Sequence, residues 1–249
     1  TYTYCFEDNW PWLGDYDMND VVIVSRIDRM TSKDGGKVSA LTINWELRAA
    51  GTTYDIAGAV QMDKVQTSDV AGVVSSHEGF GSGAFASRGL DADSPCAVIP
   101  FFNRTEELLS ASNTWKGQPA AAIRKHTTTV TFSQPVDIAS VLDSEMNFFI
   151  APKQRTSEIH MPGYAPTASG IIGKGSFLPS DPYKFFVTEG DQTKNNYMMW
   201  ALMIPGEFRY PAETNDIRGV YEYFMAWASS NGAEHAEWYL ESADAGRIY

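Results

Sequence analysis

A series of short runs rich in β-branched and aromatic residues most constrains how this chain can fold. Clusters of Gly, Pro, Asp and Ser bound these runs, which is the pattern of strands separated by turns. A helical pattern is clear in only one segment. We therefore predict a mainly β protein, with strands at residues 21–30, 37–49, 54–62, 127–132, 183–187 and 197–204.

The first two of these runs are predicted to form a hairpin. Asp34-Gly35-Gly36 separates them, and glycine readily adopts the positive φ that a tight turn requires. In residues 127–132, Val130 and Phe132 fall on one face and threonines fall on or near the other, as the two-residue period of a strand requires. We expect one face of that strand to be buried and the other to be hydrated.

One helix is predicted near the C-terminus, where Thr214 or Asn215 can cap the start and Gly232 suits the end. Its apolar residues recur at three- and four-residue steps, at Ile217, Val220, Tyr221, Phe224 and Ala228. No internal repeat or charge block divides the chain. The pattern predicts a single antiparallel β-sandwich domain over residues 1–249, with a jelly-roll-like arrangement as one version of it, and one packed C-terminal α-helix.

The charge balance excludes some partners. Lys and Arg total 19 and Asp and Glu total 31, which gives a formal net charge of −12 and argues against sequence-independent binding to nucleic acid or anionic membranes. The longest uncharged apolar run, residues 197–206, covers ten residues, whereas a helix needs about 20 to cross a bilayer. We expect no membrane-spanning segment. Cys5 and Cys96 leave a disulfide open, and the oligomeric state is open as well.

The most chemically distinctive segment is the acidic stretch over residues 7–20. It holds five carboxylates and two carboxamides, with no Lys or Arg to balance them. Asp15, Asp17 and Asn19 alternate, and this spacing in a turning loop directs oxygen atoms at one centre, as Ca²⁺ loops do. Oxygen ligands without His or Cys favour Ca²⁺ over Zn²⁺.

This loop is not an EF-hand, because Asp20 and Arg26 occupy the positions at which that motif requires Gly and Glu. Glu7, Asp8 or Asp20 could complete the about six to eight oxygens that Ca²⁺ takes. In the alternative interpretation the loop is a solvated turn whose Asp and Asn side chains cap their own backbone. Two neighbouring tryptophans favour the metal, since their rings would bury carboxylates whose repulsion then requires a counter-ion.

At this point the sequence resembles a known family. The run Phe-Glu-Asp-Asn-Trp-Pro-Trp-Leu-Gly-Asp-Tyr-Asp-Met-Asn-Asp-Val-Val, residues 6–22, is similar to the signature that opens LruC-type domains. Residues 158–167, 193–196 and 210–249 are similar to that family's later motifs. Such domains occur in secreted or lipid-anchored proteins of Gram-negative bacteria and have no established activity. The resemblance implies a place outside the cell or on the outer-membrane surface, within a larger exported or lipid-anchored protein.

The same opening is similar to calcium loops of bacterial adhesin-type β domains. That resemblance implies Ca²⁺ as a cofactor, with its ligands among Glu7, Asp8, Asp15, Asp17, Asn19 and Asp20. His160 and Tyr164, in the central motif, are the remaining candidates for ligand binding. For His160 the alternative is a hydrogen-bonding role within the loop fold, and for Tyr164 it is burial in the core.

The leading hypothesis is a non-enzymatic extracellular binding or adhesion module, stabilised by Ca²⁺, whose ligand is a glycan or a cell-surface protein. No catalytic residue is predicted, because the chain has no Gly-x-Ser-x-Gly elbow and no histidine pair at zinc-protease spacing. One alternative is a carbohydrate-active enzyme that uses paired carboxylates. Another is a structural component of a surface assembly that receives a neighbour at an edge strand.

Overall fold

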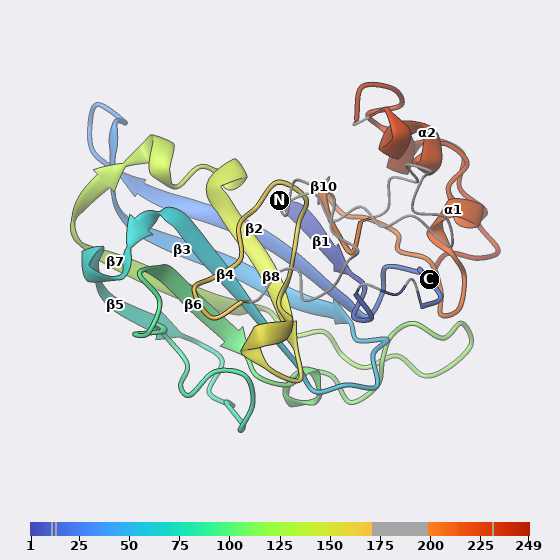
Figure 1. Cartoon of the computed structure of the whole chain (residues 1–249), viewed down its shortest axis with the longest axis horizontal. Coiled ribbons are helices and arrows are strands. Elements are labelled where there is room, and N and C mark those ends of the chain that lie inside the picture. Colours follow the sequence, from blue (N-terminus) through green and yellow to red (C-terminus); the bar gives the residue numbers. More distant parts are fainter. Residues whose placement is uncertain (11, 13, 171–198, 231) are drawn as a thin grey trace.

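The computed structural model describes residues 1–10, 12, 14–170, 199–230 and 232–249. Two antiparallel β-sheets pack face to face, and short helical pieces follow near the C-terminus (Figure 1). The predicted mainly β antiparallel sandwich is therefore confirmed. None of the helices in the described ranges is long and apolar enough to cross a membrane.

The larger sheet has six strands in the order β10-β1-β2-β3-β7-β5. Their bounds are Tyr2–Phe6 (β1), Val21–Thr31 (β2), Lys37–Ala49 (β3), Val70–Ser75 (β5), His126–Asp137 (β7) and Ala201–Pro205 (β10). The smaller sheet has the order β6-β4-β8-β9. Its strands are Ile56–Gln66 (β4), Cys96–Phe102 (β6), Met146–Pro152 (β8) and Ile159–His160 (β9).

Two α-helices and six 3₁₀ helices accompany the sheets in the part of the chain that the structure describes. The α-helices are Ile217–Val220 (α1) and Phe224–Ser229 (α2). The 3₁₀ helices are Thr67–Asp69, Thr105–Glu107, Ile138–Ser140, Asp143–Glu145, Arg155–Ser157 and Trp238–Leu240. Figure 1 shows α1 and α2 at the end of the molecule opposite the β2–β3 turn.

The strand predictions hold where they can be compared. The runs 21–30, 37–49, 54–62 and 127–132 correspond to β2, β3, β4 and β7, and the end of the run 197–204 corresponds to β10. The run 183–187 lies outside the described residues. The β2–β3 hairpin is confirmed by its ladder, and Gly35 at its turn has φ 73°. In β7, Val130 and Phe132 are buried while Thr131 is exposed, as the alternation predicts.

Aromatic side chains join the two sheets. Tyr4 of β1 stacks on Phe148 of β8 with ring centroids 4.0 Å apart, and Trp45 of β3 packs on Phe101 of β6 at 5.1 Å. These four residues are almost fully buried, and such pairs contribute about 0.5–1.5 kcal/mol beyond their buried area. The main cluster of buried hydrophobic side chains draws on both sheets and on α1 and α2. One core of this kind suits a single domain, and the domain bounds 1–249 stay a prediction.

The outer face of the smaller sheet is also covered. A second cluster of buried apolar side chains lies on β4, β6 and β8 and includes Phe85 from the connection between β5 and β6. Both faces of this sheet are therefore apolar, and all seven residues of β8 are buried.

The single C-terminal helix that we predicted is instead two short helices. Tyr221 interrupts it in an extended conformation, with φ −112° and ψ 107°, and forms an isolated β-bridge with Ala243. Its ring packs on Trp238 at 5.1 Å. Asp216 caps α1 by accepting a hydrogen bond from the Arg218 amide, in place of the predicted Thr214 or Asn215. Tertiary pairing at Tyr221 thus outweighs the local helical period.

The two cysteines are free. Cys5 is buried in β1 and Cys96 begins β6, in the other sheet. The structure therefore answers the question that the sequence left open, because no disulfide joins this pair.

Candidate metal centre

The acidic stretch forms the loop between β1 and β2. Gly14, Tyr16 and Met18 have positive φ values of 62°, 52° and 58°, so left-handed residues alternate with Asp15, Asp17 and Asn19. The Tyr16 side chain is buried, and its hydroxyl donates to the Met199 carbonyl at 2.9 Å. This anchoring holds the loop in a conformation that non-glycine residues rarely adopt.

Three of the predicted ligands meet in one cluster. Glu7, Asp15 and Asp17 each offer a carboxylate oxygen, and these oxygens lie within 4.8 Å of one another. Glu7 and Asp17 are buried, whereas Asp15 is exposed. The cluster is therefore closed by protein on the side of Glu7 and Asp17 and open to solvent at Asp15.

The oxygen atoms of this cluster are only partly satisfied. Glu7 Oε1 accepts the Met18 amide at 2.6 Å, and Asp17 Oδ2 accepts the Thr214 amide at 2.8 Å. Glu7 Oε2 and Asn19 Oδ1 are buried and have no hydrogen-bond partner in the described structure. Leaving a buried polar atom unsatisfied costs about 1–3 kcal/mol, and more when it is charged. Two such oxygens beside an acidic cluster are what a bound cation would satisfy.

Glu213 brings a further oxygen atom near Asn19, across the space that Gly51 leaves open, although Glu213 does not belong to the cluster of three carboxylates. A Cβ at Gly51 would clash with Asn19 Oδ1 and lie 3.1 Å from Glu213 Oε2, so these two side chains converge on the space that glycine leaves open. Glu213 Oε2 is also buried without a partner. The Gly51 amide donates to the Asn19 carbonyl at 3.0 Å, which fixes this approach. The sequence reasoning missed both residues, because no local motif marks either.

Asp8 and Asp20 lie next to the cluster and interact with each other. The Asp8 amide donates to Asp20 Oδ2 at 2.8 Å, and Asp8 Oδ2 accepts a hydrogen bond from the Thr52 hydroxyl. Asp8 Oδ1 has no partner in the described structure. Neither carboxylate belongs to the group of Glu7, Asp15 and Asp17. Their role as Ca²⁺ ligands stays a prediction.

Burial raises the pKa values of the carboxyl groups in and beside the cluster. Burial, followed by the charges of Asp15 and Glu213, raises the pKa of Asp17 to about 8. Burial and the neighbouring Asp8 raise the pKa of Asp20 to about 8. The pKa of Glu7 is raised well above its usual value by burial and by Asp20 and Asp17. At neutral pH the metal-free cluster must therefore hold protons or a counter-ion.

We expect the metal-free protein to lose stability as the pH rises from about 5 to about 8.5. Unfolded aspartates release their protons near pH 3.9, whereas folded Asp17 and Asp20 keep theirs to about pH 8. The folded state binds more protons in this window, so its stability is complete at the acidic side and falls as pH rises. Melting temperatures in EDTA at several pH values measure this effect.

The control for that prediction compares two substitutions. In EDTA the melting temperature of Asp17→Asn should fall less with rising pH than that of the wild type. Asp137→Asn, at a side chain that is 67% exposed, should show the same fall as the wild type. A melting temperature in EDTA that rises steadily to about pH 8 would contradict the raised pKa values.

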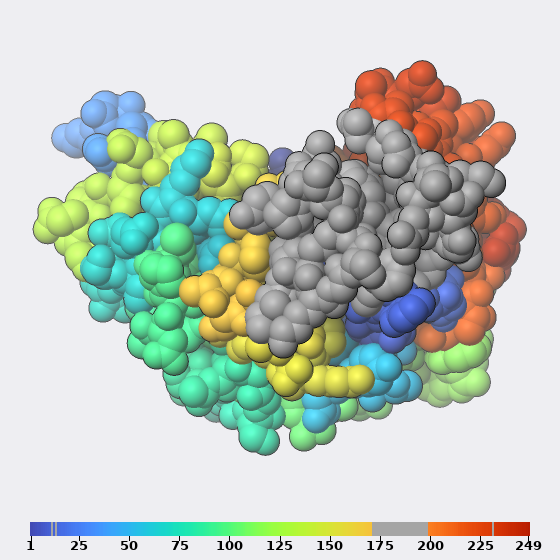
Figure 2. All heavy atoms as spheres, viewed as in Figure 1, coloured from blue at the N-terminus to red at the C-terminus, as the bar shows by residue number. Residues whose placement is uncertain are grey.

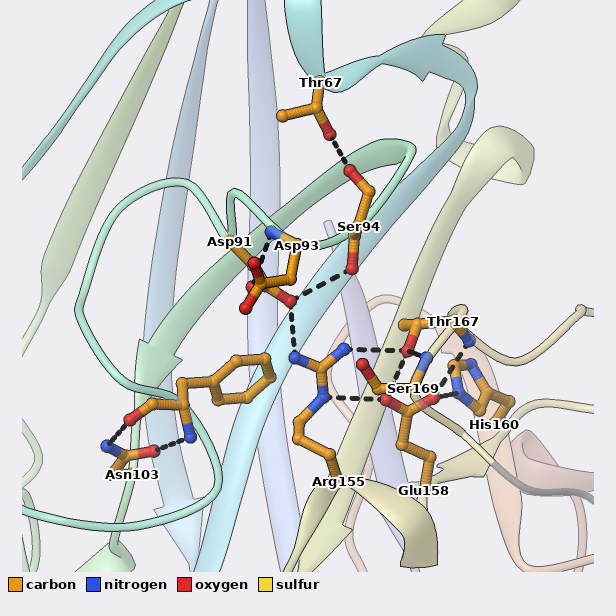
Figure 3. A network of polar contacts seen from close by, with 11 residues as sticks. Thr67, Asp91, Asp93, Ser94, Asn103, Arg155, Glu158, His160, Thr167 and Ser169 are labelled. Carbon is orange, nitrogen blue, oxygen red and sulfur yellow. Dashed lines mark hydrogen bonds and ion pairs between the residues drawn. The ribbon is translucent and has the colours of Figure 1, made fainter.

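His160 lies in a separate buried network (Figure 3). Its Nδ1 is 2.7 Å from Asn147 Oδ1, and its Nε2 is 3.0 Å from Glu158 Oε2. Glu158 also accepts the Arg155 Nε–H at 2.9 Å and the Thr167 amide at 2.9 Å. The His160 ring is fully buried, which agrees with the hydrogen-bonding alternative for this residue.

Tyr164, in the same connection, is half-buried and packs against the main hydrophobic core, which agrees in part with the core alternative for this residue. Its hydroxyl donates to the Ser144 carbonyl at 2.8 Å. A ligand-binding role for His160 or Tyr164 stays a prediction, and neither residue lies in the acidic cluster.

Comparisons with known proteins give a family and a fold. The model of a family described as "Domain of unknown function (DUF4842)" matches residues 36–239, a span that begins after the acidic loop and includes Gly51 and Glu213. A crystal structure of a putative lipoprotein from Bacteroides ovatus is similar, with a TM-score of 0.74 and 19% sequence identity. The similarity covers 100% of this chain and 74% of that one. No curated protein matches the sequence. The resemblance to LruC-type domains stays a prediction.

Proposed function

We propose that this chain, which belongs to the DUF4842 family of domains of unknown function, is an extracellular, non-enzymatic binding module stabilised by Ca²⁺. One observation carries the metal: Glu7 Oε2 and Asn19 Oδ1 are buried beside Asp15 and Asp17 and have no partner in the described structure. A cation would satisfy both oxygens and neutralise the carboxylates around them.

The donor set supports Ca²⁺. Every candidate ligand is a carboxylate or a carboxamide oxygen, which suits a hard cation. Asp15 is exposed, so water can complete the about six to eight oxygens that Ca²⁺ takes. Glu213, at the far end of the sequence, would add a carboxylate to those of the loop.

The cation would act as a cross-link between distant parts of the chain. Glu7, Asp15 and Asp17 precede or belong to the β1–β2 loop, whereas Glu213 lies in the segment before α1. Protein hydrogen bonds already join these parts, from the Thr214 amide to Asp17 and from the Asn19 carboxamide to the Pro211 carbonyl. Figure 2 shows the dark-blue N-terminal loop beside the orange C-terminal segment.

The extracellular location is supported by two arguments. The similar solved structure is described as a putative lipoprotein, and lipid-anchored proteins present their domains outside the cytosol. Extracellular modules bind Ca²⁺ with dissociation constants of about 10⁻⁴–10⁻³ M, which suits a site that is partly open to solvent.

Glycoside hydrolysis has less support than binding. That chemistry requires two carboxyl groups about 5–9.5 Å apart on either side of a substrate bond. Glu7 and Asp17 are instead buried and close to each other. The pocket beside them is lined by one carboxylate, that of Asp8. We therefore retain the binding module as the function.

Thermal unfolding in EDTA and in about 10 mM Ca²⁺ tests the proposal. That concentration is about 100 times a dissociation constant of about 10⁻⁴ M and stabilises the folded protein by about 2.7 kcal/mol, which corresponds to a rise of about 5–11 °C in a domain of this size. We expect this rise in the wild type, and its loss in Asp15→Asn/Asp17→Asn.

The matched control is Asp28→Asn/Asp137→Asn, because both side chains are more than half exposed and lie away from the cluster. It should keep the full rise. An unchanged melting temperature in the wild type, or an equal rise in the Asp15→Asn/Asp17→Asn variant, would reject the Ca²⁺ site.

A further inference from the structure

A pocket of about 460 Å³ lies beside the acidic cluster. Three connections form it: the β1–β2 loop with Asp8 and Trp12, the β3–β4 loop with Tyr54, and the β8–β9 connection with Lys153 and Gln154. Figure 2 shows these segments, in dark blue, light blue and yellow, adjoining on one face of the molecule. Its size falls in the range of small-molecule sites, about 300–1,000 Å³.

Trp12 gives the pocket a broad apolar surface on a fixed backbone. The residue is 69% exposed. Its carbonyl accepts the Nε1–H of the buried Trp200 at 3.0 Å, and its amide donates to the Asn9 carbonyl at 2.7 Å. An indole held by its backbone and presented to solvent can stack on the flat face of a ligand at little entropic cost.

Asp8 gives the pocket a buried acceptor. The residue is 7% exposed, and its Oδ2 accepts the Thr52 hydroxyl. Its Oδ1 has no partner in the described structure, although the residue lines the pocket. A ligand hydroxyl that donates to this oxygen would satisfy it, whereas an apolar ligand would leave it desolvated and unpaired.

Lys153 gives the pocket a positioned donor. Its backbone is left-handed, with φ 64°, and its amide donates to the Asp55 carbonyl at 2.8 Å. The ammonium lies 3.5 Å from the centroid of the Tyr54 ring, a cation–π contact that limits its motion. A left-handed non-glycine residue is strained, and such strain is concentrated at ligand sites.

The charges of the pocket balance. Asp8 supplies one carboxylate to the lining and Lys153 one ammonium. A ligand with a net charge of either sign would therefore meet one group of its own sign. The pocket instead fits an uncharged molecule that has both an apolar face and several hydroxyl groups.

We propose that this pocket binds a neutral saccharide unit, whose ring stacks on Trp12 and whose hydroxyls bond to Asp8 and Lys153. The inference rests on the proposed function, because it names the ligand class of the binding module. The two sites share one loop: Asp8 follows Glu7 directly, and its amide donates to Asp20. A cation at the cluster would therefore hold the Asp8 side of the pocket in place.

Affinity electrophoresis of the Ca²⁺-loaded protein tests this assignment. Native gels would contain soluble mannan, xylan, β-glucan or galactan, with polygalacturonate as the acidic comparison. We expect at least one neutral polysaccharide to retard the wild type. Trp12→Ala should weaken that binding about ten-fold or more, since an aromatic contact and its buried area are lost. Lys153→Met should weaken it as well.

Trp115→Ala is the matched control, because Trp115 is 51% exposed and does not line the pocket. It should bind as the wild type does. Each variant is also melted in EDTA and in Ca²⁺, and Trp12→Ala should keep the full Ca²⁺-dependent rise, which shows that it is folded.

The results separate this inference from the metal site. A wild type that Ca²⁺ stabilises but no neutral polysaccharide retards would overturn the saccharide assignment and leave the metal site standing. Equal retardation of the wild type and Trp12→Ala, or retardation by polygalacturonate alone, would also overturn it. Retardation that depends on Trp12 in a protein without a Ca²⁺-dependent rise would support the pocket and reject the metal.

Discussion

Gly51→Ala is expected to abolish the Ca²⁺-dependent rise in melting temperature, a loss of about 5–11 °C. The added methyl group would occupy the space into which Asn19 Oδ1 and Glu213 Oε2 point. Overpacking of this kind also costs about 1–3 kcal/mol on its own. We therefore expect the variant to melt below the wild type in EDTA and to gain nothing from Ca²⁺. Paired thermal scans with and without the cation measure both effects.

Gly72→Ala is the matched control, because nothing lies within 4 Å of a Cβ at that position. It should keep the full response to Ca²⁺. Glu213→Gln provides a milder test, since it keeps the shape of the side chain and removes one charge, and it should weaken Ca²⁺ binding without a clash. A Gly51→Ala protein that still gains several degrees from Ca²⁺ would show that the cation does not lie between Asn19 and Glu213.

Glu158→Gln is expected to lower the free energy of unfolding by about 3–5 kcal/mol, the usual cost of removing one partner from a buried ion pair. The carboxylate accepts hydrogen bonds from Arg155, His160 and Thr167. Its side chain is 1% exposed, so the remaining charges cannot regain their hydration. A glutamine carboxamide has only one acceptor oxygen, and its NH₂ group would face some of the groups that donate to Glu158. Urea denaturation at neutral pH measures the change.

The same group determines part of the acid sensitivity. Burial alone would raise the pKa of Glu158, but the hydrogen bonds from His160, Thr167 and Arg155 outweigh it and lower the pKa below its usual value. The stabilisation is therefore present above the unfolded pKa, about 4.3, and is lost as pH falls through the folded value. Stability from Glu158 therefore rises with pH, whereas the stability of the metal-free acidic cluster falls with pH.

Glu106→Gln is the control for the network, because the Glu106 side chain is 61% exposed and its pairing with Arg104 is loose. Exposed pairs of this kind contribute about 0–1 kcal/mol. Glu158→Gln should also keep its full response to Ca²⁺, since the network is separate from the cluster. A loss below about 1 kcal/mol on Glu158→Gln would show that the network adds little to stability.

The sequence predicted those strands that have a local signal. β3 over most of its length and β7 over residues 126–132 alternate between more and less buried side chains, so their period is visible. β2 is buried on both faces over residues 21–25, and its run of β-branched residues marks it instead. β6 and β8 were missed because they are apolar on both faces and show no period. The smaller sheet is covered on its outer side by the connection that includes Phe85. That coverage depends on tertiary contacts, which no local pattern records.

The residues of the candidate site also fall into those with a local signal in the sequence and those that only the fold brings together. Asp15, Asp17 and Asn19 were found because their spacing lies within one loop, and Glu7 was found because it belongs to the same acidic stretch. Gly51 and Glu213 reach the site only through the fold, from the end of the larger sheet and from the segment before α1. A glycine whose role is to leave space has no chemical signature in the sequence.

The pairing of β1 with β10 also constrains the order in which the chain can fold. β1 lies between β2 and β10, and the ladder joins Tyr2 to Pro205. The loop that closes this contact is nearly the whole chain, and closing it costs conformational entropy before the contacts form. We therefore expect the oxygens of Glu7 and Glu213 to come together late, after the transition state. Interactions made at that stage affect the rate of unfolding far more than the rate of folding. Calcium would thus extend the lifetime of the folded protein without hastening its formation.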